Sequence, residues 1–172
     1  MKLLLLVLAS GLCLVPRAQA ETTVKLSNVH LCCNACVKGV ERSVAKLTEV
    51  TAEIDKDGGT VTFKAANDGA AQKAVTAMAA AGYHGKADNT KFAMKDDSGA
   101  KDEKVASLKI TNIHMCCKAC VRGLNKALSK VDGVTGNDAV EKVDSFTATG
   151  NFNAKALVQA LHDAGFHGKV GK

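Results

Sequence analysis

The sequence predicts an α+β fold built from two similar units in tandem. Three observations carry this prediction. The order strand, helix, strand, strand, helix, strand can be followed twice along the chain. A histidine with three cysteines occupies residues 30–36, and a second copy occupies residues 114–120, 84 positions later. A polar stretch separates the two copies, as expected for a duplicated domain.

The first unit begins with a strand over residues 24–29, where apolar and polar side chains alternate. This strand leads into the first cysteine cluster. A helix is expected directly after it, over residues 35–47, because apolar side chains recur there at helical spacing. These side chains are Val37, Val40, Val44 and Leu47.

Two further strands are expected over residues 50–54 and 60–64, joined by a turn at Asp57-Gly58-Gly59. An alanine-rich segment over residues 69–81 predicts a second helix, which the glycine after it ends. Residues 83–87 complete the unit as a short strand.

Residues 89–104 interrupt the pattern with a polar run of mixed charge, which predicts a linker. Within it, residues 91–95 are expected to form an extra edge strand. The chain therefore divides into residues 21–88, the linker, and residues 105–172.

The second unit repeats the first. Its first strand is expected at residues 108–113, and Val121, Leu124, Leu128 and Val131 repeat the apolar helix face. The later elements are expected at residues 134–143, 144–149, 153–164 and 166–169. Two units of this order predict two tandem ferredoxin-like βαββαβ sandwiches, each an antiparallel sheet backed by two helices.

Residues 1–20 have the pattern of a cleavable signal peptide. Lys2 is followed by the apolar run Leu3–Leu8, and Ala18-Gln19-Ala20 forms a small-residue cleavage site. The apolar run is too short for a membrane span. We therefore expect a periplasmic or secreted protein with no membrane span after cleavage.

Composition argues against nucleic-acid binding. Without residues 1–20 the chain has 21 basic and 17 acidic residues, a net charge of +4, and it contains no Trp and one Tyr. A charge this small and the lack of aromatic stacking residues do not fit a nucleic-acid surface.

Six cysteines remain outside the signal peptide, and they are the candidate metal ligands: Cys32, Cys33, Cys36, Cys116, Cys117 and Cys120. Each cluster lies at the start of a predicted helix, where backbone N–H groups stabilise negative charge. We therefore expect lowered pKa values at Cys33, Cys36 and their copies. Such thiolates bind soft metals or exchange disulfides, and a structural disulfide between Cys33 and Cys36 stays an alternative.

The segment Met115-Cys116-Cys117-Lys118-Ala119-Cys120 resembles the Met-x-Cys-x-x-Cys motif of the heavy-metal-associated domain family. The first copy matches with Leu31 in place of Met, and both copies have Gly followed by an aromatic residue after the second helix. The resemblance implies metal ligation by Cys33 with Cys36, and by Cys117 with Cys120. It also implies a non-enzymatic, exported carrier similar to copper- or mercury-binding proteins.

Four histidines recur in the two copies and are further candidate ligands: His30, His114, His84 and His167. His30 and His114 depart from the family, which usually has Gly there, and strand alternation alternatively makes them surface residues. His84 and His167 directly follow the aromatic residue that the family places near its metal loop. The resemblance therefore implies that they are ligands or support the ligands. His162 has no counterpart and is expected to be solvated in the last turn of a helix.

Two thiolates suit a digonal ion such as Cu(I) or Hg(II), whereas three thiolates with an imidazole suit Zn(II) or Cd(II). We expect a soft ion, Cu(I) first, with one ion captured by each cysteine loop for carriage, buffering or detoxification. The alternatives are a thiol-disulfide redox protein and a disulfide-stabilised interaction module. Basic side chains on the two cysteine-led helices indicate either an acidic metal-exchanging partner or a solvated face: Lys38, Arg42, Lys46, Arg122, Lys126 and Lys130.

Overall fold

The computed structural model describes residues 20–171, so the proposed signal peptide lies outside the described residues except for Ala20. The first half contains β1 (Thr22–Ser27), α1 (Asn34–Val44), β2 (Val50–Asp55), β3 (Thr60–Ala65), α2 (Asp68–Ala80) and β4 (Lys86–Ala87). The second half contains β5 (Lys104–Thr111), α3 (Lys118–Leu128), β6 (Val134–Asn137), β7 (Ser145–Asn153), α4 (Ala154–Asp163) and β8 (Lys169–Val170).

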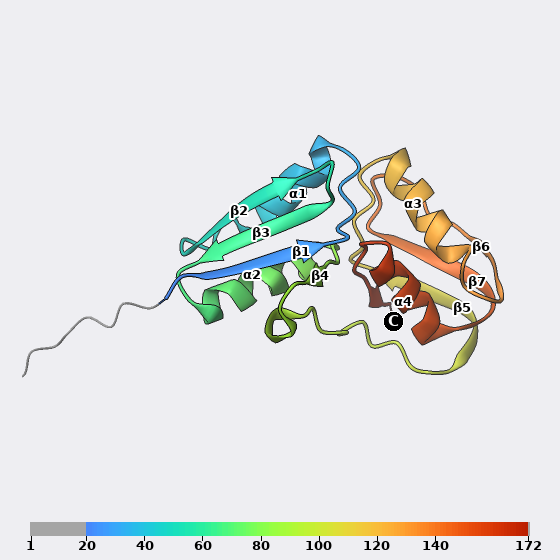
Figure 1. Cartoon of the computed structure of the whole chain (residues 1–172). Coiled ribbons are helices and arrows are strands. Elements are labelled where there is room, and N and C mark those ends of the chain that lie inside the picture. Colours follow the sequence, from blue (N-terminus) through green and yellow to red (C-terminus); the bar gives the residue numbers. More distant parts are fainter. Residues whose placement is uncertain (1–19, 172) are drawn as a thin grey trace, which may run out of the picture.

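Each half forms a four-stranded antiparallel sheet backed by two helices, so the α+β prediction is confirmed. The strand orders, β2-β3-β1-β4 and β6-β7-β5-β8, are the same and are consistent with a ferredoxin-like sandwich. The two halves lie side by side, and the loop after β1 runs between them (Figure 1). No helix in the described part of the chain is long and apolar enough to cross a membrane.

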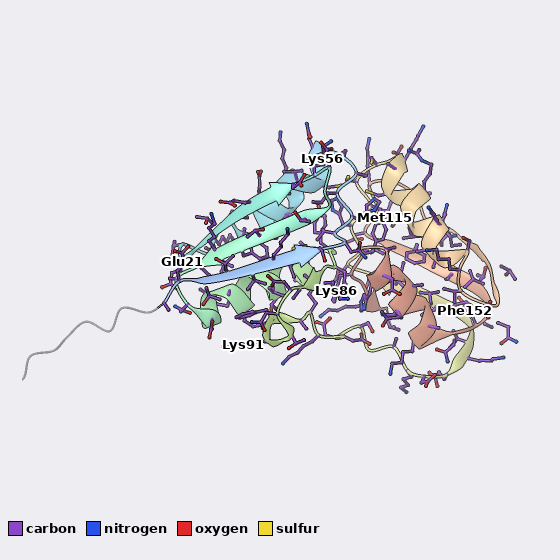
Figure 2. All side chains as sticks on the ribbon, viewed as in Figure 1. Glu21, Lys56, Lys86, Lys91, Met115 and Phe152 are labelled. Carbon is purple, nitrogen blue, oxygen red and sulfur yellow. The ribbon has the colours of Figure 1, made fainter. Side chains whose placement is uncertain are left out.

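Each core lies between its sheet and its helices, because alternate strand side chains turn inward to meet the apolar helix faces. Val24 and Leu26 of β1 and Val40 of α1 belong to the buried core in the first half, as do Ile110 of β5 and Leu124 of α3 in the second. Leu31 and Met115, directly before the cysteines, are also buried. Met115 lies where the two halves meet (Figure 2).

The first strand of each half ends two residues before its predicted end, at Ser27 rather than 29 and at Thr111 rather than 113. The cause is a left-handed backbone at Asn28 (φ 60°) and Asn112 (φ 57°), directly after the strands. Asparagine tolerates this conformation better than most residues, and it ends the strand pairing there. Both cysteine loops therefore turn away from their own sheets toward the other half.

The predicted extra strand at residues 91–95 is wrong, since residues Thr90–Phe92 form a single 3-10 turn, η1. The side chain of Asn89 accepts a hydrogen bond from the N–H of Lys91, and Phe92 turns inward and is buried. The second-half strand predicted at 134–143 is also too long. It ends at Asn137, whose side chain accepts the N–H of Ala139 and starts a turn.

The two final strands are shorter than predicted, because the chain first pairs across the halves. Tyr83 and Phe166 form an antiparallel bridge between the halves. The N–H of His84 donates to the carbonyl of Gly165 (3.0 Å), and the N–H of His167 donates to that of Gly82 (3.0 Å). This reciprocal pairing fixes how the two halves face each other.

Candidate metal centre

The six cysteines of the two halves form one cluster. The cysteines that meet across the halves lie 80 or more positions apart in the sequence. Cys32 lies 3.5 Å from Cys117 and 3.3 Å from Cys120, measured between sulfur atoms. The copy of this arrangement places Cys116 3.6 Å from Cys33 and 3.5 Å from Cys36. The sequence predicted two separate loops with one ion each. In the structure the loops share one site, because both turn toward the interface.

The sulfur atoms are arranged as triangles that share edges. Cys36 and Cys120, both fully buried, lie 3.9 Å apart at the centre. Cys32 lies 3.6 Å from Cys36 and 3.3 Å from Cys120, which closes one triangle. Cys116 closes another, at 3.5 Å and 3.7 Å from the same two sulfurs. Each of these triangles contains sulfurs from both halves.

Cys33 and Cys117 lie at the outer ends of the cluster. Each is the residue before a helix and has an extended backbone (φ −161° and −155°). Cys33 is 3.8 Å from Cys36, and Cys117 is 4.0 Å from Cys120. All six thiols are free, so the Cys33–Cys36 disulfide is not formed in this structure.

The expected lowering of the thiol pKa is found at Cys117. The backbone N–H of Cys120 donates to the sulfur of Cys117 and lowers the pKa of Cys117 to about 7, against a smaller effect of burial. At Cys36 the prediction is wrong, since the hydrogen bond with Cys120 and burial raise the pKa. At Cys120 the hydrogen bond with Cys36 lowers the pKa. Burial and the sulfurs of Cys32 and Cys116 outweigh this effect, so the pKa is raised overall.

Burial also raises the pKa values of Cys32 and Cys116 well above the ordinary range. Six thiolates at these separations would repel one another, so the metal-free cluster keeps most of its protons. A bound cation would supply the missing positive charge and displace these protons.

His30 and His114 lie beside the cysteine cluster, and each ring stacks on an aromatic ring from the other half of the molecule. His30 stacks on Phe166 (centroids 4.3 Å apart), and His114 stacks on Tyr83 (4.4 Å). Both rings are half-buried, so the surface interpretation is wrong. The ligand atoms of Cys36, His114, Cys116 and Cys120 all lie within 4.8 Å of one another, and so do those of His30, Cys32 and Cys120.

Two glycines, one in each cysteine-led helix, make room for these rings. A β-carbon at Gly39 would lie 2.0 Å from the hydroxyl oxygen of Tyr83, and one at Gly123 would lie 2.6 Å from the ring of His30. Glycine costs about 0.5–1 kcal/mol inside a helix, so its presence three residues after each last cysteine is a signal that sequence reasoning missed.

His84 and His167 do not join the cysteines. They form a separate group with His162, whose ligand atoms also lie within 4.8 Å of one another. His162 is buried, and the expectation of a solvated side chain is wrong. The helix-end position suggested solvent, but the other half of the molecule covers it with His84.

The six basic side chains on and directly after α1 and α3 are all exposed: Lys38, Arg42, Lys46, Arg122, Lys126 and Lys130. Their exposure fits both a docking surface and a solvated face. The exposure of these side chains therefore does not decide between the two interpretations.

No protein-family model and no curated protein matches this chain. One solved structure that it resembles is the solution structure of the N-terminal soluble domains of Bacillus subtilis CopA. The sequence identity is 19%, the TM-score is 0.31, and the match covers 89% of this chain and 95% of that chain. A likeness at this identity and TM-score adds nothing to the geometry described above.

Proposed function

We propose that this protein is an exported, non-enzymatic metal-binding protein of the heavy-metal-associated type. It holds soft metal ions, Cu(I) first, in the six-thiol cluster between its halves. One observation carries the proposal: sulfur atoms from both halves lie 3.3–4.0 Å apart around a buried centre. Thiolates are the ligands that select Cu(I) and other soft ions.

The sulfur separations favour a particular coordination. With metal–sulfur bonds of about 2.3 Å, two sulfurs lie about 3.8 Å apart on a tetrahedral ion, about 4.0 Å on a trigonal ion and about 4.6 Å on a linear ion. The separations in the cluster, 3.3–4.0 Å, are nearest to the first two values and are too short for the third. We therefore favour trigonal or tetrahedral ions held jointly by both halves over one digonal ion in each loop.

The same geometry supports a buffering or carrier role. Cys33 and Cys117 lie at the ends of the sulfur cluster, and Cys117 has the lowered pKa, so these thiols are suited to make the first contact with an incoming ion. Ligand exchange then passes the ion to the buried Cys36 and Cys120. An acidic metal-donating or metal-accepting protein would be attracted to the exposed basic faces of α1 and α3.

Native mass spectrometry tests this proposal. The purified protein is reduced, stripped of metal and offered Cu(I), Zn(II) and Hg(II) in competition. We expect tight binding, with Cu(I) preferred over Zn(II), and we expect loss of binding after the cysteines are alkylated. A wild-type protein that binds no metal while its thiols are reduced would overturn the proposal.

The double variant Cys33→Ser with Cys36→Ser tests whether the cluster is shared. Removing Cys36 breaks triangles that contain Cys116 and Cys120, so the affinity of the whole cluster should fall. Retention of half the ions at unchanged affinity would instead indicate two independent loops. Ser43→Ala, on α1, with Ser129→Ala, directly after α3, is the control and leaves all six thiols in place.

A thiol-disulfide redox function is the second candidate, favoured by the lowered pKa of Cys117 beside Cys120. It predicts catalytic turnover in a disulfide reductase or isomerase assay with the metal-free protein, and loss of turnover in Cys117→Ser. Turnover no faster than that of a free thiol compound would argue against the redox function and leave metal binding as the remaining candidate.

A further inference from the structure

Three histidines form a second group of potential ligands, apart from the cysteines. His84 comes from the loop after α2, His162 from the last turn of α4, and His167 from the loop before β8. His162 and His167 are 7% and 1% exposed, and His84 is half-buried. The group therefore lies between the halves, with one ligand from the first and two from the second.

The three rings are held nearly parallel. His84 stacks on His162 with centroids 4.0 Å apart and an interplanar angle of 6°, and His84 lies 5.6 Å from His167 at 3°. Nδ1 of His84 faces Nδ1 of His167 at 3.3 Å. The reciprocal backbone hydrogen bonds of His84 and His167 with Gly165 and Gly82 fix this distance.

A carboxylate sets the orientation of one ring. Asp97, in the linker, accepts a hydrogen bond from Nε2 of His167 at 2.8 Å, and its other oxygen pairs with Lys169 at 2.9 Å. Because Nε2 of His167 carries the proton, Nδ1 of His167 accepts the hydrogen bond from Nδ1–H of His84, and a metal ion would take the place of that proton. Carboxylates commonly support metal-binding histidines in this way.

The third ring has an unsatisfied nitrogen. Nε2 of His162 is buried and has no hydrogen-bond partner among the described residues. Burial and the neighbouring imidazoles lower the pKa of His84 to about 3 and lower that of His162 as well, so these rings are neutral at pH 7. Neutral imidazoles have the lone pairs that a metal ion requires.

We propose that His84, His162 and His167 form a second metal site, which binds a divalent transition-metal ion of the Zn(II) type through nitrogen ligands alone. Metal–nitrogen bonds of about 2.0–2.1 Å place two nitrogens about 3.3 Å apart on a tetrahedral ion, the separation of the two Nδ1 atoms. Imidazole ligands suit Zn(II), Cu(II) and Ni(II), whereas the thiols suit softer ions. The two sites therefore select different metals.

The fourth coordination position of this site is open among the described residues, so water or an exchangeable ligand would complete it. Since ligands come from both halves, binding would hold the halves together independently of the cysteines. This inference goes beyond the proposed function and does not require it.

Co(II) titration distinguishes the two sites. The reduced protein is first loaded with Hg(II) to occupy the thiols and is then titrated with Co(II). We expect one Co(II) per chain with visible d–d absorption and without the near-ultraviolet charge-transfer band of a cobalt–thiolate bond. Absence of Co(II) binding, or binding only with the thiolate band, would overturn the site.

Variants of the Hg(II)-loaded protein, titrated with Zn(II) in a calorimeter, identify the ligands. His162→Ala should weaken Zn(II) binding by at least ~100-fold, and Asp97→Asn, which affects ring orientation only, by about 10–100-fold with the Co(II) spectrum retained. Gln159→Ala, earlier on α4, is the control and should bind as wild type. Unchanged Zn(II) affinity in His162→Ala would contradict the proposal.

A measurement on the wild type covers the case in which a variant fails to fold. Zn(II) should shift the imidazole NMR signals of His84, His162 and His167 together at one equivalent. Shifts confined to His30 and His114 would place Zn(II) in the cysteine cluster and overturn the second site. Soft-metal binding by the thiols is measured separately, so failure of one site does not count against the other.

Discussion

The hydroxyl group of Tyr83, in the first half, lies 2.9 Å from Nε2 of His114 in the second half. The hydroxyl donates its one hydrogen to the carbonyl of Cys36 at 3.0 Å, so Nε2 of His114 must donate to the hydroxyl oxygen. Nδ1 of His114 is thereby left with a lone pair. The equivalent aromatic of the second half is Phe166, and Nε2 of His30 has no partner among the described residues. The two histidines are therefore unequal as ligands.

This inequality predicts the effect of Tyr83→Phe. The change removes two buried hydrogen bonds, to the carbonyl of Cys36 and from His114, and should lower the free energy of unfolding by about 1–3 kcal/mol. It also frees the orientation of His114, so the Zn(II) affinity of the cysteine cluster should fall. Urea unfolding and Zn(II) competition measure the two effects.

The reverse change is the matched test. Phe166→Tyr offers a hydroxyl to the His30 side of the interface, and it should leave His114 and its contribution unaffected. Equal Zn(II) affinity in wild type and Tyr83→Phe would show that His114 does not support the cluster.

Gly82 lies where the backbones of the two halves come close together. Its φ is +87°, and a β-carbon there would lie 2.4 Å from the backbone nitrogen of His114. Gly82→Ala should therefore cost about 1–2 kcal/mol for the left-handed backbone and about 1–3 kcal/mol more for the overlap. Thermal unfolding of the metal-free protein is the measurement.

Gly99→Ala is the control for this variant, because Gly99 also has a positive φ (+76°) but has nothing within 4 Å of the added β-carbon. It should show the backbone cost alone. Equal losses in the two variants would argue against the close packing of the halves at Gly82.

Cys117 should be the thiol that reacts fastest in the metal-free protein near neutral pH. Its pKa is lowered to about 7 by the N–H of Cys120, whereas hydrogen bonding and burial raise the pKa of Cys36. Alkylation of Cys117 should therefore rise with pH around a midpoint of about 7, as followed by peptide mass mapping. Preferential labelling of Cys36 would contradict this assignment.

The same shift has a consequence for stability. The folded-state pKa of Cys117 lies below its ordinary value, so its contribution to stability is fully present above the ordinary thiol pKa. That contribution is lost as the pH falls through about 7. Cys117→Ser should remove this pH dependence. Urea unfolding of the metal-free protein between about pH 6 and about pH 10 can check this, since the range runs from about one unit below the folded-state pKa to about one unit above the ordinary thiol pKa.

Metal removal should loosen the two halves from each other. Any ion that binds only the folded state stabilises it, by about 2.7 kcal/mol at a free concentration of 100 times the dissociation constant. Because the cluster takes ligands from both halves, a chelator should lower the unfolding midpoint of both together in calorimetry. A midpoint that moves for one half alone would indicate that the ion is held within that half.

Local patterns in the sequence determined most of the fold. Alternation and helical spacing predicted the order of strands and helices in each half, because these periods reflect which side chains face the core. The three-cysteine motif identified the thiols in the same way, since all three lie within five residues of one another. The short strands at residues 83–87 and 166–169 were less well predicted, because their pairing depends on the other half.

The shared site was decided by tertiary structure alone. No local period records that Asn28 and Asn112 turn the cysteine loops toward each other, or that Gly82 and Gly165 let the halves approach. His162 lacked a repeat counterpart and therefore any sequence signal, yet the interface buries it against His84. The sequence by itself determined which ligands each half carries. Only the packing of one half on the other decided that the cysteines of the two halves form one cluster and that the histidines form another. Contacts between residues so far apart in the chain depend on how the surfaces of the two folded halves fit together.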